Sequence, residues 1–261
     1  MEVSPNEPFQ ILCCNQVWKD DDNGDPTFDH RMVILRHGEQ YFFGRDSRRK
    51  GDIDPALLSL GPIPITHIRA PFTADLTIAP DLPLDLEDVY IKEPGLVAYG
   101  HCSLAEQQAF FEPQLQEAQV YEQLRLKPHP NIGIYHGCIV KDGRIKGLCL
   151  RRYGRTLGQL LREETLGQDQ KTAYMDDVKK GVAHLHALGF VHGDINPSNI
   201  MLDSRINQAV LIDFDSCRPV GKPMGRKAGT TNWGSVDCPE VAELEHDHTA
   251  LQLIERLLED S

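Results

Sequence analysis

One polar stretch in the C-terminal half constrains this 261-residue chain more than any other feature. Asp194 and Asn199 stand five positions apart in a turn-rich loop, and Asp213 closes a β-branched, strand-like run fourteen residues later. Asp and Asn are common in loops, where they bond their own backbone. The order here is more specific, because a predicted helix over residues 169–188, with Gly189 as its C-cap, precedes the loop. Two carboxylates and an amide in this order suit a site that orients a hydroxyl and holds Mg²⁺ against phosphates.

The stretch resembles the catalytic loop and metal-binding strand of the protein kinase superfamily, whose signatures are H-R-D-L-x-x-x-N and D-F-G. In this chain the loop is H-G-D-I-N-P-S-N over residues 192–199, and the strand end is D-F-D over residues 213–215. The resemblance implies that Asp194 is the catalytic carboxylate and that Asn199 and Asp213 hold Mg²⁺. It also implies an α+β, two-lobed protein kinase-like fold, with a small β-rich N-lobe and a helical C-lobe.

A second match lies upstream, where V-Y-I-K over residues 89–92 resembles the kinase pattern V-A-I-K. In that family the lysine, here Lys92, contacts the nucleotide phosphates, and a glutamate from the following helix pairs with it. The predicted helix over residues 115–124 offers Glu117 for this role when the leucines are aligned, with Glu122 on another face as the alternative. The resemblance therefore implies a site for ATP and Mg²⁺ formed by Lys92, Glu117, Asp194, Asn199 and Asp213, of which Lys92, Asp194, Asn199 and Asp213 are the expected catalytic residues.

Several residues depart from the family pattern, although the likeness covers roughly residues 85–258. Gly193 replaces the arginine of H-R-D, and Asn196 replaces the lysine that protein serine/threonine kinases keep two residues after the aspartate. Asp215 replaces the glycine of D-F-G, which adds a carboxylate beside the metals. Residues 61–83 contain no G-x-G-x-x-G, so the usual glycine-rich loop over the phosphates is missing.

The C-terminal part resembles a shortened kinase lobe. Residues 228–233 resemble the end of an activation segment, and residues 238–240 resemble A-P-E two positions late. A final helix is predicted over residues 246–258, introduced by Asp247, whose family counterpart bonds the backbone of the catalytic loop. Only fourteen residues follow Asp247, so we expect a truncated C-lobe that lacks the last helices.

Three regions are predicted along the chain: an N-terminal β-hairpin extension on or beside the N-lobe over residues 1–60, the N-lobe over 61–150, and the truncated C-lobe over 151–261. Strands are expected at residues 9–12, 31–35, 40–43, 132–137 and 148–150, with short helices near 54–58 and 157–162. Residues 150–153 fall at the hinge, where backbone groups would meet adenine. The acidic run over residues 20–25 lacks the spacing of an EF-hand and predicts a solvated turn.

Composition narrows the class of protein. A formal net charge of −12 disfavours general binding to nucleic acid or anionic membranes, although the basic runs at residues 45–50 and 218–227 could form a local patch. The seven scattered cysteines include no C-x-x-C pair, which argues for a reducing compartment. No apolar run approaches the roughly 20 residues of a membrane span. We expect a cytoplasmic protein without a membrane partner, and the nucleus is not excluded.

Three functions are compatible with these features. The first is an ATP-dependent phosphotransferase that acts on a hydroxyl of a protein or a small molecule, as aminoglycoside-type phosphotransferases with H-G-D loops do. The second is a pseudokinase that binds nucleotide or acts as a scaffold. The third is a kinase fold used for another transfer, such as adenylylation or the aminoacyl-tRNA-dependent reaction of arginine-containing cyclodipeptide synthases. A tRNA partner is expected only in this third case.

Overall fold

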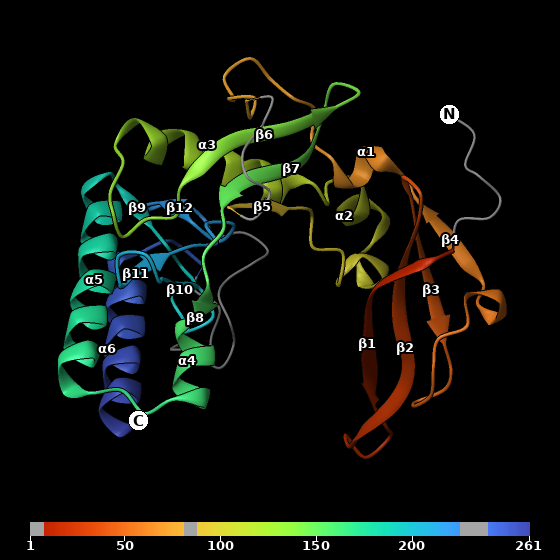
Figure 1. Ribbon diagram of the computed structural model, residues 1–261. Coiled ribbons are helices and arrows are strands. Elements are labelled where there is room, and N and C mark those ends of the chain that lie inside the picture. The colour runs from red at the N-terminus through yellow and green to blue at the C-terminus, as the bar shows by residue number, and fades with distance from the viewer. Residues whose placement is uncertain (1–7, 81–87, 225–239) are drawn as a thin grey trace. The chain divides into compact units, whose positions relative to one another are not determined.

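The structure of the protein is a computed structural model that describes residues 8–80, 88–224 and 240–261 (Figure 1). The chain divides into two compact units. Unit 1 comprises residues 1–71 and 93–112, and unit 2 comprises residues 72–92 and 113–261. Residues 93–112 are therefore an insertion that belongs to unit 1, although both of its ends are joined to unit 2.

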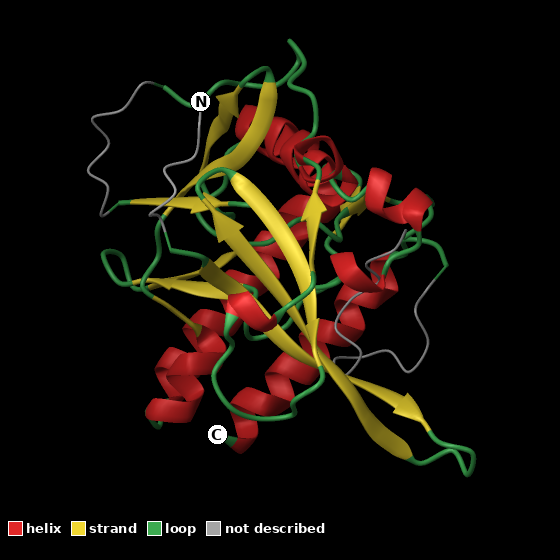
Figure 2. Ribbon diagram, turned by 90° about the vertical axis from the view of Figure 1, so that its right-hand side faces the viewer, coloured by secondary structure: helices red, strands yellow, loops and turns green. Residues whose placement is uncertain are grey.

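Unit 1 contains an antiparallel sheet in the order β1-β2-β3-β4, whose long, twisted strands are yellow in Figure 2. Its strands are β1 (Gln10–Asp20), β2 (Pro26–His37), β3 (Gln40–Asp46) and β4 (Leu60–Ile63). The predicted hairpin is confirmed, and it turns at Gly38, where φ is 59°. Such a positive φ favours glycine because a side chain would be strained there.

The acidic run between β1 and β2 forms a tight turn. One carboxylate oxygen of Asp21 accepts hydrogen bonds from the backbone N–H groups of Asn23 at 2.9 Å and Asp25 at 3.0 Å. The carboxylate thus satisfies local backbone donors, as is common for Asp in turns. The predicted exposed turn is confirmed for this segment.

Short helices and the inserted segment supply the core of unit 1. The helices are η1 (Pro55–Leu57), α1 (Ile65–Ile68), η2 (Tyr99–His101) and α2 (Leu104–Gln108). Leu96 and Tyr99 of the insertion pack with Ile34 and Ile68 in one apolar cluster. Tyr99 is 1% exposed, and its hydroxyl lies 2.7 Å from Nδ1 of His67. The insertion therefore completes the core of unit 1.

In unit 2, a second antiparallel sheet has the order β5-β7-β6. It comprises β5 (Val89–Lys92), β6 (Tyr135–Lys141) and β7 (Arg144–Arg151), and helix α3 (Glu112–Leu126) lies between β5 and β6 in the chain. The N-terminal segment of unit 2 runs beside β6, where Ile78 forms a parallel bridge with Cys138. This segment passes where the family would carry its glycine-rich strands.

The remaining elements of unit 2 are mostly helical. They are β8 (Arg155–Thr156), α4 (Leu157–Glu163), α5 (Gln168–Ala187), β9 (Phe190–Val191), β10 (Ile200–Asp203), β11 (Gln208–Leu211), β12 (Arg218–Pro219) and α6 (Leu244–Asp260). Helices α5 and α6 lie side by side, and Lys179 forms an ion pair with Glu255 at 2.7 Å (Figure 1).

The predicted start of the last helix, residue 246, was two residues too late. Helix α6 begins at Leu244 because Glu243 is its N-cap and forms a capping box with His246. Asp247 therefore lies inside the first turns of the helix, where its carboxylate is directed to another segment.

The chain is mixed α+β, with a β-rich N-terminal part and a helical C-terminal part, which confirms the predicted fold class. The region boundaries at residues 60 and 150 stay predictions. Residues 228–233 and 238–239, part of the expected activation segment, lie outside the described residues. Within the described ranges, no helix is both long and apolar enough to cross a membrane.

We expect Tyr99→Ala to lower the free energy of unfolding by about 3–5 kcal/mol, because it removes a large buried side chain and leaves a cavity. Urea denaturation followed by circular dichroism measures this loss. Leu104→Ala is the matched control in the same insertion, since Leu104 is 69% exposed and its loss should cost less than about 0.5 kcal/mol. Equal effects of the two substitutions would show that the insertion does not contribute to the core.

Candidate active site

The expected catalytic loop, residues 192–199, connects β9 to β10 in unit 2. Helix α5 ends just before it, and Gly189 has a φ of 81°, the left-handed conformation that often ends a helix. Strand β9 pairs with β12, and the backbone N–H of Ile212 donates to the carbonyl of Asn199 at 3.0 Å. Both ends of the loop are thus tied to neighbouring strands.

Asp247 anchors the backbone of this loop from helix α6. Its side chain is almost fully buried, and its two carboxylate oxygens accept hydrogen bonds from the N–H groups of His192 at 2.8 Å and Gly193 at 2.9 Å. His186 on α5 lies 2.8 Å from the same carboxylate through Nε2. The hydrogen bond implied by the family resemblance is therefore confirmed in the structure.

Two asparagines hold the carboxylate of Asp194. Asn199 donates through Nδ2 to one carboxylate oxygen at 3.0 Å, and Asn196 donates through Nδ2 to the other at 3.1 Å. The backbone N–H of Asp194 donates to Nδ1 of His192 at 3.3 Å, so Nε2 of that ring carries the hydrogen that faces Ile212 O. Asn196, which replaces the family's lysine, thus orients Asp194 without adding charge.

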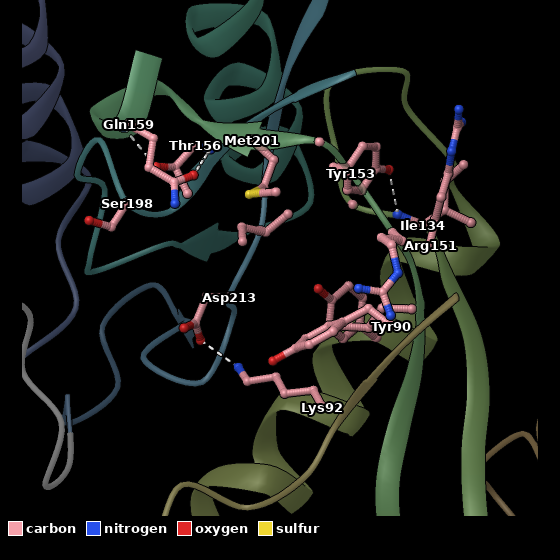
Figure 3. Close-up of a pocket in the computed structure, with 16 residues that line it drawn as sticks. Tyr90, Lys92, Ile134, Arg151, Tyr153, Thr156, Gln159, Ser198, Met201 and Asp213 are labelled. Atoms are coloured by element: carbon pink, nitrogen blue, oxygen red, sulfur yellow. Dashed lines mark hydrogen bonds and ion pairs between the residues drawn. The ribbon is translucent and has the colours of Figure 1, made fainter. Parts of the chain in front are cut away.

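Lys92 joins three elements of unit 2 at one point. Its Nζ lies 2.8 and 2.7 Å from the two carboxylate oxygens of Glu117 on α3, and 2.7 Å from Oδ1 of Asp213 after β11 (Figure 3). Glu117 is 1% exposed and also accepts a hydrogen bond from the backbone N–H of Phe214 at 3.2 Å. The lysine, the helix and the D-F-D turn are thereby fixed to one another.

The turn that carries Asp213 has an unusual backbone. Asp213 has a φ of 65°, in the left-handed region that Asp adopts more readily than most residues. Phe214 is fully buried, and its ring centroid lies 5.1 Å from that of Tyr121 and 5.2 Å from that of His192. Burial of the phenylalanine on one side of the chain leaves the preceding aspartate directed at Lys92.

Acidic groups gather around Lys92. Burial by itself would lower the pKa of Lys92, but the facing carboxylates of Glu117, Asp213 and Asp215 outweigh it and raise that pKa above its usual range. Full burial raises the pKa of Glu117 to about 7 against the attraction of Lys92. Several carboxylates therefore act on the Lys92 ammonium, and a divalent cation beside them would be attracted by the same groups.

A cavity of about 390 Å³ opens beside Lys92 (Figure 3). Its lining comes from strands, from helices α3 and α4 and from connecting loops of unit 2, and includes Tyr90, Lys92, Leu150, Tyr153, Met201 and Asp213. The volume is in the range of small-molecule sites. The predicted hinge residues thus line the same cavity as the expected phosphate-binding lysine.

Glu122, the alternative partner of Lys92, has another role. Its carboxylate accepts hydrogen bonds from the backbone N–H of Thr77 at 2.7 Å and from the hydroxyl of Thr77 at 2.9 Å. It fastens the segment beside β6 to helix α3. In the structure it is Glu117 that contacts Lys92.

The structure brings the expected site residues together in two sets. Lys92 contacts both Glu117 and Asp213, and Asp194 contacts Asn199. Two further residues were not assigned from the sequence. The orienting role of Asn196 depends on loop geometry, whereas Tyr90 could have been found from its spacing of two from Lys92, which places both on one face of a strand.

The residues expected to hold Mg²⁺ have suitable atoms. The side chain of Asn199 donates through Nδ2 to Asp194, and none of its hydrogen bonds in the described part of the chain uses Oδ1. Asp213 supplies a carboxylate, and Mg²⁺ prefers such oxygen ligands. The oxygen donors of these two residues therefore fit a magnesium-bound nucleotide.

Comparison with known proteins agrees with this geometry. Residues 97–250, more than half of the chain, match the family described as the protein kinase domain. The chain is 36% identical over 98 residues to E3 ubiquitin-protein ligase KEG of Arabidopsis thaliana, covering 37% of this chain and 6% of that protein. It is 31% identical over 87 residues to serine/threonine-protein kinase sax-1 of Caenorhabditis elegans, covering 33% and 18%. A third relative is the MAPK/MAK/MRK overlapping kinase of Homo sapiens, 32% identical over 100 residues, covering 37% and 23%. The matches span less than a quarter of the length of each relative.

The raised pKa of Glu117 predicts a defined pH dependence of stability. A folded-state pKa of about 7 against an ordinary value of 4.5 means that the folded protein binds more protons between these values. The contribution of protonated Glu117 to the free energy of unfolding is therefore complete below pH 4.5 and is lost as the pH rises through about 7. We expect the wild type to lose up to roughly 3 kcal/mol relative to Glu117→Gln over this range, because one pKa unit corresponds to about 1.4 kcal/mol.

Urea denaturation of both proteins at pH 5, 6, 7 and 8 measures this difference. Glu245→Gln on the exposed side of α6 is the control, and its curve should stay parallel to that of the wild type. If the wild type instead gained stability relative to Glu117→Gln as the pH rises, the attraction of Lys92 would outweigh the burial of Glu117.

Proposed function

Because the chain belongs to the protein kinase domain family, we propose that it is an ATP-dependent phosphotransferase that transfers the γ-phosphate to a hydroxyl of a protein or a small molecule. One observation carries this proposal most directly. Lys92 lies within 2.8 Å of both Glu117 and Asp213 at the edge of a cavity large enough for a ligand. In a nucleotide-binding site of this kind, a lysine held by a glutamate is placed to contact the phosphates.

Different residues of the site would bind different parts of MgATP. Lys92, held by Glu117, would contact the α- and β-phosphates. Asn199 Oδ1 and the carboxylate of Asp213 would hold Mg²⁺. The bound nucleotide and its metal ions supply the phosphoryl group and offset the charge on its oxygens. The backbone of residues 151–153 would meet the base at the other end of the cavity.

Asp194 would orient the acceptor hydroxyl and take its proton. Asn196 and Asn199 fix the direction of the carboxylate, and Asp247 fixes the backbone on which it stands. Most of the rate gain in such a site comes from positioning and electrostatics, so a fixed carboxylate is what the reaction requires.

Asn196 bears on the kind of molecule that accepts the phosphate. Protein serine/threonine kinases keep a lysine at this position, whereas this chain has a neutral amide that bonds Asp194. The H-G-D loop is similar to that of aminoglycoside-type phosphotransferases, which act on small molecules. A small hydroxylated molecule is therefore as well supported as a protein acceptor, and both belong in the test.

A second candidate is a nucleotide-binding scaffold without transfer. It is favoured by Asp215, which replaces a glycine and is buried beside the site, where it adds negative charge near Lys92. In the described part of unit 2, the sheet β5-β7-β6 also carries no glycine-rich hairpin. This candidate shares nucleotide binding with the first and differs from it in turnover.

We expect saturating MgATP to stabilise the folded protein by about 2.7 kcal/mol at a hundredfold excess over its dissociation constant. Asp194→Asn should keep this stabilisation and abolish phosphate transfer, because an amide cannot accept the proton. Thermal unfolding measures binding. Incubation with γ-labelled ATP, separately with casein and with a metabolite extract, followed by mass spectrometry, measures transfer.

Asp142→Asn is the matched control, because Asp142 lies in the exposed turn between β6 and β7 and the change also removes one carboxylate. It should leave both readouts unchanged. Folded wild-type protein that is not stabilised by MgATP would contradict the proposal. MgATP binding without transfer to any acceptor would favour the scaffold.

A further inference from the structure

Strand β5 departs from its family pattern at a position that faces the cavity. The pattern V-A-I-K has alanine two residues before the lysine, whereas this chain has Tyr90. Side chains two apart on a strand point to the same face, so Tyr90 shares its face with Lys92. Both residues line the 390 Å³ cavity. A phenol ring therefore lies on the wall that also carries the phosphate-binding lysine.

Arg152, which also lines the cavity, lies beside the ring of Tyr90. Its guanidinium carbon lies 6.0 Å from the centroid of Tyr90, and its Nε donates to the carbonyl of Val89 at 3.1 Å. The hydrogen bond holds the arginine against the strand that carries the tyrosine, and the guanidinium is attracted to the ring. The ring is thus supported, while 47% of the residue remains exposed.

The opposite wall of the cavity carries apolar side chains beside the polar ones of Thr156, Gln159 and Ser198. Met201 on β10 and Ile212 after β11 both line it, and Figure 3 shows Met201 across the cavity from Tyr90. Lys92 and Asp213 lie together at one end, where Figure 3 shows their contact. The cavity thus has a charged end for phosphates and an aromatic-to-apolar slot beside it.

We propose that Tyr90 is the base-stacking residue of the nucleotide site, and that it determines the selectivity for ligands with a planar aromatic base. This inference rests on the proposed function and deepens it. The ring lines the cavity and does not fill it, since a volume of about 390 Å³ remains with the tyrosine in place. A base between Tyr90 and Met201 would have an aromatic face on one side and a polarisable thioether on the other.

The alternative physical effect is obstruction. A tyrosine is larger than the alanine of the family pattern, and a ring that occupied the base position would weaken nucleotide binding. The two effects predict opposite signs when the ring is removed. Stacking contributes about tenfold or more to affinity for each base by alanine substitution, whereas relief of an obstruction would increase affinity.

Isothermal titration calorimetry of Tyr90→Ala and Tyr90→Phe with two probes tests the proposal. The probes are MgATP, which has a base, and magnesium tripolyphosphate, which does not. We expect Tyr90→Ala to weaken MgATP binding about tenfold or more and to leave tripolyphosphate binding unchanged. Tyr90→Phe keeps the ring and should bind both probes as the wild type does.

Equal or tighter MgATP binding by Tyr90→Ala would overturn the proposal. An equal loss for both probes would also overturn it, because damage to the Lys92 end would then explain the result. Wild-type protein that binds tripolyphosphate and MgATP equally well would show that the base is not recognised. Wild-type protein that binds neither probe would remove the proposed function, and this inference with it.

Discussion

The pairing of buried Glu117 with Lys92 is the interaction on which the rest of unit 2 depends. It joins strand β5, helix α3 and the turn after β11, which are remote along the chain. A buried ion pair adds little net stability, because removing both groups from water costs about as much as their attraction returns. Its effect is on geometry, since loss of Lys92 would remove the cation that faces the buried carboxylate of Glu117, whereas loss of Glu117 would leave the lysine with Asp213.

On the other side of the site, neutral amide side chains hold a functional group in place, as charged side chains do around Lys92. Asn196 and Asn199 hold Asp194, and the carboxylate of Asp247 holds two backbone N–H groups of the same loop. In the loop over residues 192–199, the side chain of Ile195 is buried. Hydrogen bonds from helix α6 and from within the loop add to this anchor, so the docked last helix helps to set the conformation of the loop.

Much of this arrangement could be predicted from the sequence, where the signal is local. Apolar spacing indicated α3, α5 and the hairpins, and the leucines of α3 pointed to Glu117 as the partner of Lys92. The start of α6 was misplaced because Glu243 and Asp247 are both acidic, and the capping role depends on backbone geometry. The insertion was missed because its apolar residues, such as Tyr99, are partnered by strands some sixty residues away, and such long-range partners leave no periodic pattern.

The path of the chain between the units has a consequence for how this protein can be divided. The chain crosses from unit 2 into unit 1 directly after Lys92 and returns at the start of the helix that carries Glu117. Unit 1 is therefore not a separable appendage of the kinase-like part. A deletion of the first 71 residues would strip the apolar partners from the inserted segment, yet that segment would still tether the lysine to its glutamate. To replace the sheet of unit 1 with that of another protein, the inserted segment over residues 93–112 would have to be replaced together with it. Such an exchange needs chain crossovers at both ends of the insertion as well as after residue 71.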